Sequence, residues 1–588
     1  MDKKQLNSAL KQKHLVTEPV LAQLEKDLIQ LKTVEPWEDF LVEKKALTEE
    51  QLLGVKSEIL GVPVIDLRNQ QIAQDVLNLV PEPIAHRHQV ISFAKTKEDL
   101  SLAMTDPTDL QTKEFIQKKT GLVIKTFLIG RTGLDFGLSK YHSSLEKEIK
   151  HLFAVPTPGQ ALTAGGDKGS EEDLEDGLKK MAEEIPVIRV VDTLLEYAIF
   201  EKASDIHIEP QENSVVVRYR IDGVLHDVMT LPKVIQAAIV ARIKVLSNLK
   251  IDEHRLPQDG RFKVDKDGYK FSLRVSTIPI FDGEKVVIRL LDESTKASSL
   301  EDLGFEKISL ELINRNIKKP HGMLLVTGPT GSGKSTTLYT VLSMLNTKSV
   351  NISTIEDPVE YRITGTNQMQ VSPKIGLTFA MGLRALLRQD PNIIMIGEIR
   401  DKETAEEAVH AAMTGHIVFS TLHTNDAAAA LPRLLDIGVE PYLIASTINA
   451  VLAQRLVRVI CKDCQTQIKL DDTIIESLSK QFHLDKLLPV MIKQGAVPAK
   501  TKDLKEVPFF KGQGCDKCNH TGYHGRMGIH EILEVTPIIG SMIMNRKSAQ
   551  EIQEQAEKDG MVLMWEDGFI KASKAITTID EIVRVSKE

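Results

Sequence analysis

The residues with the clearest chemistry form the segment GPTGSGKST at positions 328–336. It fills the phosphate-loop pattern G-x-x-x-x-G-K-[ST] completely. Glycines let the backbone fold around phosphate groups where a Cβ would clash, the lysine places a positive charge between the β- and γ-phosphates, and the serine hydroxyl is a ligand for Mg²⁺. The predicted nucleotide-binding residues are Gly328, Pro329, Thr330, Gly331, Ser332, Gly333, Lys334, Ser335 and Thr336.

The segments on either side of this loop have the required secondary structure. Residues 323–326 (MLLV) form an apolar run typical of a strand, and residues 335–342 have helical spacing. A helix that begins at the loop directs its N-terminal N–H groups at an anion. The flanking pattern therefore favours a functional nucleotide site over a chance match.

Two carboxylates follow short apolar strands downstream of the loop. Glu356 ends the segment ISTIE and Glu398 ends IIMIGE. In a parallel sheet the carboxyl ends of the strands face the bound phosphates. One carboxylate can hold Mg²⁺, directly or through water, and the other can orient and deprotonate the attacking water. The alternative is that these acids cap the helices that follow.

His416 and His423 bracket a strand-like segment, IVFSTL. A lone histidine is usually a surface or core residue with ordinary partners. Two histidines at the ends of one strand beside a nucleotide site are better explained as phosphate-sensing or interface groups. No third ligand lies nearby in the sequence, so a metal role is not supported.

Arginines are concentrated between residues 184 and 300, several of them on predicted strands. They are Arg218, Arg220, Arg255, Arg261, Arg274 and Arg289. Guanidinium groups delivered from a neighbouring domain or subunit can meet the negative charge that develops in phosphoryl transfer. The alternative is a solvated strand face with surface ion pairs, and the residues alone leave the two readings open.

All four cysteines fall in two C-x-x-C pairs, Cys461/Cys464 and Cys515/Cys518. Four thiolates suit a tetrahedral, structural Zn²⁺ site with no open coordination position. The 50 residues between the pairs exceed the spacing of a simple zinc ribbon, so a small insertion separates them. Two redox pairs or disulfides are the alternatives, disfavoured in a reducing cytosol.

Length and composition set the broad class. The 588 residues exceed one core, and 42% hydrophobic with 27% charged residues is ordinary for a globular protein. A net charge of −8 argues against a protein whose main function is to bind nucleic acid. No apolar run reaches the ~18 residues of a membrane span, and the first residues lack the apolar core of a signal peptide. We therefore expect a cytoplasmic, multidomain α/β protein with at most peripheral membrane association.

Composition shifts predict four regions. Residues 1–145 begin with two helical segments that repeat weakly at an offset of 31 and continue as a small α/β unit, and residues 146–183 form a Gly-, Pro- and acid-rich flexible linker. Residues 184–300 mix helices (187–200 and 235–249) with alternating strands (215–223 and 271–277). Residues 301–588 alternate as β-α-β, which predicts a parallel sheet with the phosphate loop after its first strand, and they end in a helical run, 550–585.

The order of motifs resembles the secretion-superfamily ATPases, which include the type II secretion motor and the type IV pilus assembly motor. The matching segments are TIEDPVE, LRQDPNIIMIGEIRD, TGHIVFSTLHTNDA, QRLVRVICKDC, ASDIHIEP, RYRIDGVL, EHRLPQDGR, GCDKCNHTGYHGRMGIHE and TTIDEIVRV. The resemblance is strong over 184–588 and weaker over 1–145. It implies a RecA-like P-loop core at 301–588 with the four-cysteine insertion at 461–518, preceded by a PAS-like α/β domain.

The resemblance also implies roles for residues. It implies ATP and Mg²⁺ as cofactors, a hexameric ring, and phosphate contacts from Arg255, Arg261 and Arg274. We predict Glu356 as general base, because in such folds the water-activating glutamate follows the strand beside the phosphate-loop strand. Glu398 then supports Mg²⁺ through water, and the Ser335 hydroxyl is a ligand for it. The implied partners are an inner-membrane platform protein of a pilus or secretion machine and its cytoplasmic adaptor, reached peripherally from the inner face of the cytoplasmic membrane.

One departure from the family concerns the N-terminal repeats. LKQK at residue 10 and LVEK at residue 41 stand where the cyclic di-GMP-binding version of the domain has Arg-Leu-Gly. Regulation by cyclic di-GMP is therefore not expected. The first domain and the cysteine insertion disfavour a pilus retraction motor. The long N-terminal region and linker favour pilus assembly, with type II secretion as the alternative.

Two further classes remain as contrasts. A nucleic-acid translocase is opposed by the acidic composition, and no nucleic-acid partner is expected. A nucleotide-sensing adaptor without hydrolysis is opposed by the intact Lys334, Glu356 and Glu398.

Overall fold

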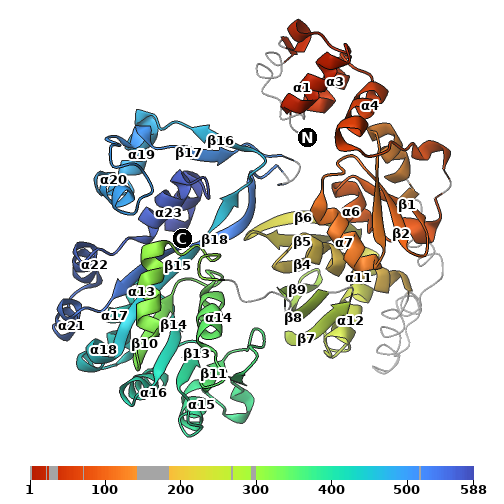
Figure 1. Cartoon of the computed structure of the whole chain (residues 1–588). Coiled ribbons are helices and arrows are strands. Elements are labelled where there is room, and N and C mark those ends of the chain that lie inside the picture. Colours follow the sequence, from red (N-terminus) through yellow and green to blue (C-terminus); the bar gives the residue numbers. More distant parts are fainter. Residues whose placement is uncertain are drawn as a thin grey trace. The chain divides into compact units, whose positions relative to one another are not determined.

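The structure is a computed structural model (Figure 1) that describes residues 3–21, 23–24, 37–70, 72–138, 140–141, 185–266, 269–292, 299–515, 518 and 520–587. The chain divides into two compact units, Met1–Ser294 and Thr295–Glu588. Each unit has its own sheets and core. The predicted linker 146–183 lies outside the described residues, and the predicted domain boundaries stay predictions.

The first unit begins with a small helical group. Its helices are α1 (Lys3–Gln12), α3 (Trp37–Glu43) and α4 (Glu49–Leu60). Thr48 caps α4 through a capping box with Gln51, and Gly61 ends the helix in the left-handed conformation. Leu6, Leu10, Phe40 and Leu41 are buried in a separate small core.

A three-stranded sheet follows, as the sequence predicts for a small α/β unit. Strand β2 lies between β1, which is antiparallel to it, and β3, which is parallel. The elements are η1 (Leu67–Asn69), α5 (Gln74–Leu77), α6 (Glu82–Arg87), β1 (Val90–Lys95), β2 (Asp99–Met104), α7 (Leu110–Thr120) and β3 (Val123–Leu128).

The rest of the first unit is a six-stranded antiparallel sheet with the strand order β6-β5-β4-β9-β8-β7. Alternate residues of β5 are buried, so one face covers the core and the other remains partly open. The elements are α11 (Ile185–Phe200), β4 (Asp205–Pro210), β5 (Ser214–Ile221), β6 (Val224–Pro232), η2 (Lys233–Ile235), α12 (Gln236–Leu246), β7 (Gln258–Lys266), β8 (Tyr269–Ile280) and β9 (Gly283–Asp292). The predicted helices and strands of this region are confirmed.

The second unit is built on a seven-stranded sheet, shown in green to blue in Figure 1, with the order β12-β11-β13-β14-β10-β15-β18. Every pair except β15–β18 is parallel. The first elements are α13 (Lys307–Ile317), β10 (Gly322–Thr327), α14 (Lys334–Leu345), β11 (Ile352–Glu356), β12 (Thr366–Gln370), η3 (Pro373–Ile375), α15 (Phe379–Leu386), β13 (Ile393–Ile396), α16 (Lys402–Met413) and β14 (Ile417–Leu422). The predicted parallel sheet, with the phosphate loop after its first strand, is confirmed.

Burial explains this arrangement. All residues of β10, β13 and β14 are buried, as expected for strands covered by helices on both faces. Successive residues of β10 join different cores: Met323 and Leu325 pack on one face, Leu324 and Val326 on the other. The sheet is thus a rigid platform whose carboxyl edge can hold polar side chains in place.

The chain completes the sheet with a long hairpin-like pair that carries the cysteine insertion. The remaining elements are α17 (Ala430–Ile437), α18 (Pro441–Thr447), β15 (Ile448–Ile460), β16 (Gln465–Ile468), α19 (Asp472–Ser479), α20 (Leu484–Lys493), η4 (Leu504–Glu506), β17 (Phe509–Gly512), β18 (Tyr523–Glu534), α21 (Pro537–Met544), α22 (Ala549–Lys558), α23 (Met564–Ser573) and α24 (Ile579–Lys587). Among the described helices, none combines the length and apolar character needed to cross a bilayer.

Candidate active site

The phosphate loop joins β10 to α14. Gly328, Gly331 and Gly333 have φ angles of 143°, 83° and 89°, in the region that favours glycine. A Cβ on Gly328 would lie 2.4 Å from the backbone carbonyl oxygen of Gln454, and a Cβ on Gly333 would lie 2.7 Å from its side-chain nitrogen. Both positions favour glycine for conformation, and at Gly328 the backbone of Gln454 also leaves no space for a Cβ.

The donors of this loop fit a phosphate ligand. Lys334 is buried at the start of α14, and its Nζ donates to the carbonyl oxygens of Gly328 (2.8 Å) and Pro329 (2.9 Å). Burial lowers the pKa of Lys334, and the negative charge of Glu398 opposes this shift. Among the described residues no partner is found for the buried Ser332 Oγ. A buried hydroxyl, a lysine and a helix N-terminus are together the donor set that binds phosphate oxygens.

The carboxyl edge of the sheet brings several predicted residues into one row. On one side of β10 the strands lie in the order β14, β13 and β11. Along the chain, His423 comes just after β14, Glu398 comes shortly after β13, and Glu356 is the last residue of β11. The expectation that the Glu356 strand lies beside the phosphate-loop strand is wrong. Two strands, β13 and β14, lie between them, which at ~4.8 Å per strand separates β11 from β10 by about 14 Å. The helices that connect the strands place the later strands β13 and β14 between β10 and β11. The order of the strands along the chain does not give their order in the sheet.

Glu356 is held by neutral donors. It is 3% exposed, and it accepts hydrogen bonds from Thr354 Oγ1 (2.6 Å), Gln368 Nε2 (3.2 Å) and the hydroxyl of Tyr339. Burial raises the pKa of Glu356, and these hydrogen bonds oppose the shift. Tyr339 lies on α14, so it connects Glu356 to the helix that begins at the phosphate loop despite the intervening strands.

Glu398 instead lies beside a guanidinium group and an imidazole ring. Its Oε1 lies 2.7 Å from Arg400 Nη2, and its Oε2 lies 3.2 Å from Nε2 of His423. Arg400 is well exposed, with 68% of its side chain accessible. Of the two carboxylates, only Glu398 contributes to the electrostatic shift of Lys334, which places it nearer the loop lysine.

The two histidines lie at opposite ends of strand β14. His423 follows β14 and contacts Glu398, whereas His416 precedes β14. They are seven residue steps apart along the strand, about 23 Å at ~3.3 Å per residue. The ring of His416 lies 2.9 Å from the carbonyl oxygen of Ala411 at the end of α16. Within this subunit His416 is therefore not part of the row, and only its predicted interface role remains open.

The predicted arginines belong to the first unit. Arg261 on β7 pairs directly with Arg274 on β8, which in turn pairs with Arg289 on β9. Like charges opposite one another on neighbouring strands are unfavourable unless anionic groups lie beside them. Arg289 also donates to Asp205 (3.0 Å). Arg255 lies exposed in the loop before β7. The phosphate contacts predicted for these arginines stay predictions.

Residues around the carboxylates were not found from the sequence. Tyr339 looked like an ordinary helix residue, and Gln368 lies on the edge strand β12. Only the pairing of β11 with β12 places Gln368 beside Glu356. Arg400 was visible within the acidic motif GEIRD, and its position two residues after Glu398 was the available signal.

The four cysteines lie together at the end of the β15–β18 pair. Their sulfurs are all within 4.8 Å of one another, with Cys461–Cys515 and Cys464–Cys518 separations of 3.8 Å. All four are free thiols here. Four ligands at ~2.3 Å around a tetrahedral Zn²⁺ lie about 3.8 Å apart, so the donor set fits the predicted metal.

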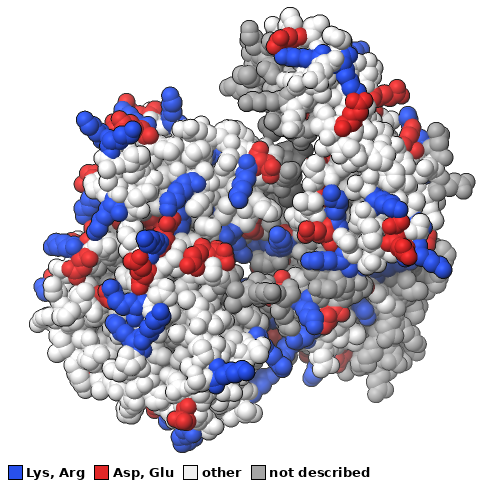
Figure 2. All heavy atoms as spheres, in the orientation of Figure 1, with Lys and Arg blue, Asp and Glu red and all other residues white. Residues whose placement is uncertain are grey.

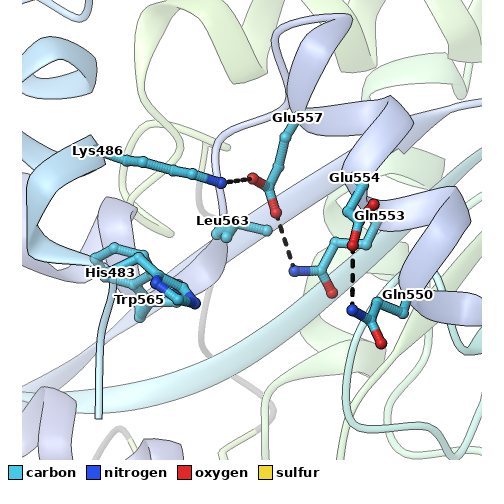
Figure 3. A pocket seen from close by; sticks show the side chains of 8 residues that line it. All are labelled: His483, Lys486, Gln550, Gln553, Glu554, Glu557, Leu563 and Trp565. Atoms are coloured by element: carbon cyan, nitrogen blue, oxygen red, sulfur yellow. Dashed lines mark hydrogen bonds and ion pairs between the residues drawn. The ribbon is translucent and has the colours of Figure 1, made fainter. Parts of the chain in front are cut away.

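A separate surface pocket lies between α20, α22 and α23 (Figure 3). Its polar side chains bind one another: Lys486 donates to Glu557 (3.0 Å), as does Gln553 (3.2 Å). Trp565 and His483 form the wall opposite these groups. None of the predicted site residues lines this pocket, so it is distinct from the nucleotide site.

Known proteins match this chain over most of its length. The family model described as type II/IV secretion system protein matches residues 180–584, and that of the MshEN domain matches residues 60–143. The chain is 39% identical to the type IV pilus assembly ATPase PilB of Myxococcus xanthus, over 92% of each chain. It is 40% identical to type II secretion system protein E of Xanthomonas campestris, over 90% of each chain. It is similar in structure to the pilus retraction motor PilT with bound ADP, at 25% identity and a TM-score of 0.45, over 67% of this chain and 96% of PilT.

The type II/IV secretion system family model, over residues 180–584, covers the phosphate loop, both carboxylates and the cysteine insertion. The chain therefore belongs to the type II/IV secretion system protein family and is an ATPase of that family.

Proposed function

We propose that this ATPase drives assembly of a type IV pilus. The observation that carries the proposal is the match to a pilus assembly ATPase along 92% of both chains, with the phosphate loop and both carboxylates inside the matched region. The comparable match to type II secretion system protein E supports the alternative, assembly of a pseudopilus for protein export. Pilins and pseudopilins are the substrates that distinguish the two.

Residues 328–336 hold the phosphates of ATP in this proposal. Loop N–H groups, Lys334 and Ser332 neutralise and orient the phosphate oxygens, and Ser335 with Glu398 holds Mg²⁺. The hydroxyl of an exposed Ser335 and a carboxylate are the hard oxygen ligands that Mg²⁺ prefers, so the residues fit the ion. Bound Mg²⁺ supplies charge neutralisation on the β- and γ-phosphates.

Glu356 accepts the proton of the attacking water. Its raised pKa suits a proton acceptor, and Tyr339, Thr354 and Gln368 fix the direction of its oxygens. His423 orients Glu398 and senses the bound phosphates. In this proposal Arg255, Arg261 and Arg274 meet the developing charge in a ring of six chains.

The cysteine cluster is proposed to hold one structural Zn²⁺. Elemental analysis of the purified chain should find about one zinc per chain, with thiols that react with a disulfide reagent only after unfolding. Replacing Cys461 and Cys515 by serine should remove the metal. No zinc in a native protein whose four thiols react freely would contradict this assignment.

The proposed partners follow from the motor role. Six copies form the ring, which associates peripherally with a platform protein at the cytoplasmic face of the inner membrane and with that protein's cytoplasmic adaptor. Cyclic di-GMP is not proposed as a regulator, because both N-terminal repeats lack the Arg-Leu-Gly start.

The decisive experiment compares pili and export in the native host. Lys334→Ala should abolish ATP hydrolysis while the protein still accumulates. Loss of surface pili with normal protein secretion supports the proposal. Loss of secretion with normal piliation replaces it by the alternative.

A nucleic-acid translocase is the contrasting class. Figure 2 shows acidic and basic side chains interspersed among the described residues of the visible face. DNA-stimulated hydrolysis that falls steeply with salt would favour that class instead.

A further inference from the structure

Gln454 lies on β15, the strand that flanks β10 on the side opposite the carboxylate row. The last paired residues of these strands are Thr327 and Ala453, so Gln454 stands level with the first glycine of the phosphate loop. It is 2% exposed, although glutamine is usually a surface residue. A buried primary amide at this point needs partners.

Both ends of the Gln454 amide have them. Its Nε2 donates to the backbone carbonyl oxygen of Ser332 (2.8 Å), inside the phosphate loop. Its Oε1 accepts from the hydroxyl of Thr337 (2.7 Å), in the first turn of α14. One side chain therefore binds the loop and the helix that follows it to the same strand.

The close approach of this residue also explains two glycines. The Gln454 carbonyl oxygen occupies the space that a Cβ on Gly328 would need, and its Nε2 occupies that of a Cβ on Gly333. The loop thus packs against Gln454 at its first residue, at Ser332 and at its last glycine. Contacts at both ends and near the middle leave little freedom for the loop as a whole.

We propose that Gln454 is a positioning residue that holds the phosphate loop in its nucleotide-binding shape. The inference rests on the proposed binding of ATP phosphates at this loop. Gln454 acts through Ser332 and Thr337 and does not itself bind the nucleotide. Leucine has a similar volume and removes both hydrogen bonds, whereas asparagine keeps the amide but is one methylene too short to reach both partners.

The test measures MgATP affinity, steady-state kinetics and hydrogen exchange on the full chain. Leucine leaves the buried carbonyl oxygen of Ser332 without its hydrogen-bond donor, which disfavours the binding shape of the loop. Gln454→Leu should therefore raise the MgATP Kd and KM about tenfold. The kcat should change by less than about threefold, because Glu356 and Glu398 lie on other strands. Exchange of the amides in 328–338 should accelerate.

A matched control separates positioning from general stability. Asn316, on α13, is also a fully buried amide; it donates to Leu312 O (2.9 Å) on the same helix and to Glu534 Oε1 (3.1 Å) on β18, away from the loop. Asn316→Leu should lower the melting temperature while the MgATP Kd and exchange of 328–338 stay at wild-type values. Thr337→Val, which removes only one of the two hydrogen bonds, should raise the Kd about threefold, so the proposal remains testable if Gln454→Leu folds poorly.

Two results would overturn the inference. One is a MgATP Kd within twofold of wild type in both Gln454→Leu and Gln454→Asn, with loop exchange unchanged. The other is an equal loss of affinity in Asn316→Leu. Lys334→Ala distinguishes this failure from failure of the proposed site: if Lys334→Ala still binds MgATP normally, the loop is not the nucleotide site at all.

Discussion

Glu356 and Glu398 stand at the ends of neighbouring strands of one sheet, yet their surroundings are opposite. Glu356 is enclosed by two hydroxyls and an amide, all neutral. Glu398 lies between Arg400 and His423, and its charge is felt by Lys334. Both carboxylates lie at the same end of the sheet, where neighbouring strands end. The side chains around each one make the two chemically different.

The difference assigns each carboxylate a task. A carboxylate with neutral donors and a raised pKa can take up a proton without first breaking an ion pair. A carboxylate close to the loop lysine and paired with Arg400 is placed to balance charge near the metal and phosphates. Substitutions around each carboxylate test whether the two groups have these separate tasks.

The largest effect is expected from neutralising Glu356. Glu356→Gln keeps the shape and most hydrogen bonds but cannot accept a proton, so kcat should fall by about 10³, within the 10²–10⁴ range of general-base catalysis. MgATP affinity should stay within about twofold, measured by fluorescence titration. The matched control is Glu406→Gln on α16, whose carboxylate is exposed and paired with Lys402, and which should turn over normally. Near-normal kcat in Glu356→Gln would remove Glu356 as the base.

A smaller effect is expected from Tyr339→Phe. The hydroxyl of Tyr339 donates to Glu356 and lowers the pKa of that carboxyl, against the raising effect of burial. Because the base acts as the carboxylate, kcat rises as pH increases through this pKa. Losing the hydroxyl raises the pKa, so the acidic limb of the kcat profile should move to higher pH, and kcat at each pH on that limb should be lower than in the wild type.

The control for this profile is Tyr442→Phe, because Tyr442 is exposed on α18. Its kcat–pH curve should overlay that of the wild type. An acidic limb that stays in place, or moves to lower pH, in Tyr339→Phe would show that Glu356 does not set this limb.

The smallest effect is expected on the Glu398 side. Arg400 is largely exposed, and exposed ion pairs contribute only ~0–1 kcal/mol. Arg400→Gln removes a competitor for one Glu398 oxygen, so the Mg²⁺ concentration for half-maximal hydrolysis should fall about twofold to threefold at low salt and less at high salt. An increase in the Mg²⁺ requirement would mean that Arg400 assists the metal site.

The sequence predicted what is encoded locally. The phosphate loop is complete within nine residues, and the two carboxylates were visible because each ends a short apolar strand. The order of strands was not visible: β11 was expected beside β10, and only the packing of crossover helices places β13 and β14 between them.

Contacts between distant segments were also hidden. Gln368 reaches Glu356 through the pairing of an edge strand, and Arg261, Arg274 and Arg289 align only in the observed register. Gln454 lay inside a recognised motif, but its burial against the loop depends on β15 pairing with β10. His416 is the opposite case. Its position in the sequence suggested that it belongs to the nucleotide site, but it precedes β14 and therefore lies at the other end of that strand.

The central claim is that the two carboxylates divide the work of hydrolysis. Its most direct test is a Mg²⁺ titration of single-turnover ATP hydrolysis in Glu356→Gln and Glu398→Gln. We predict that Glu398→Gln requires about tenfold more Mg²⁺ but recovers measurable turnover at saturation, whereas Glu356→Gln stays about 10³-fold slow at every Mg²⁺ concentration. Turnover of Glu356→Gln that is restored by Mg²⁺, with Glu398→Gln inactive at saturation, would contradict the account.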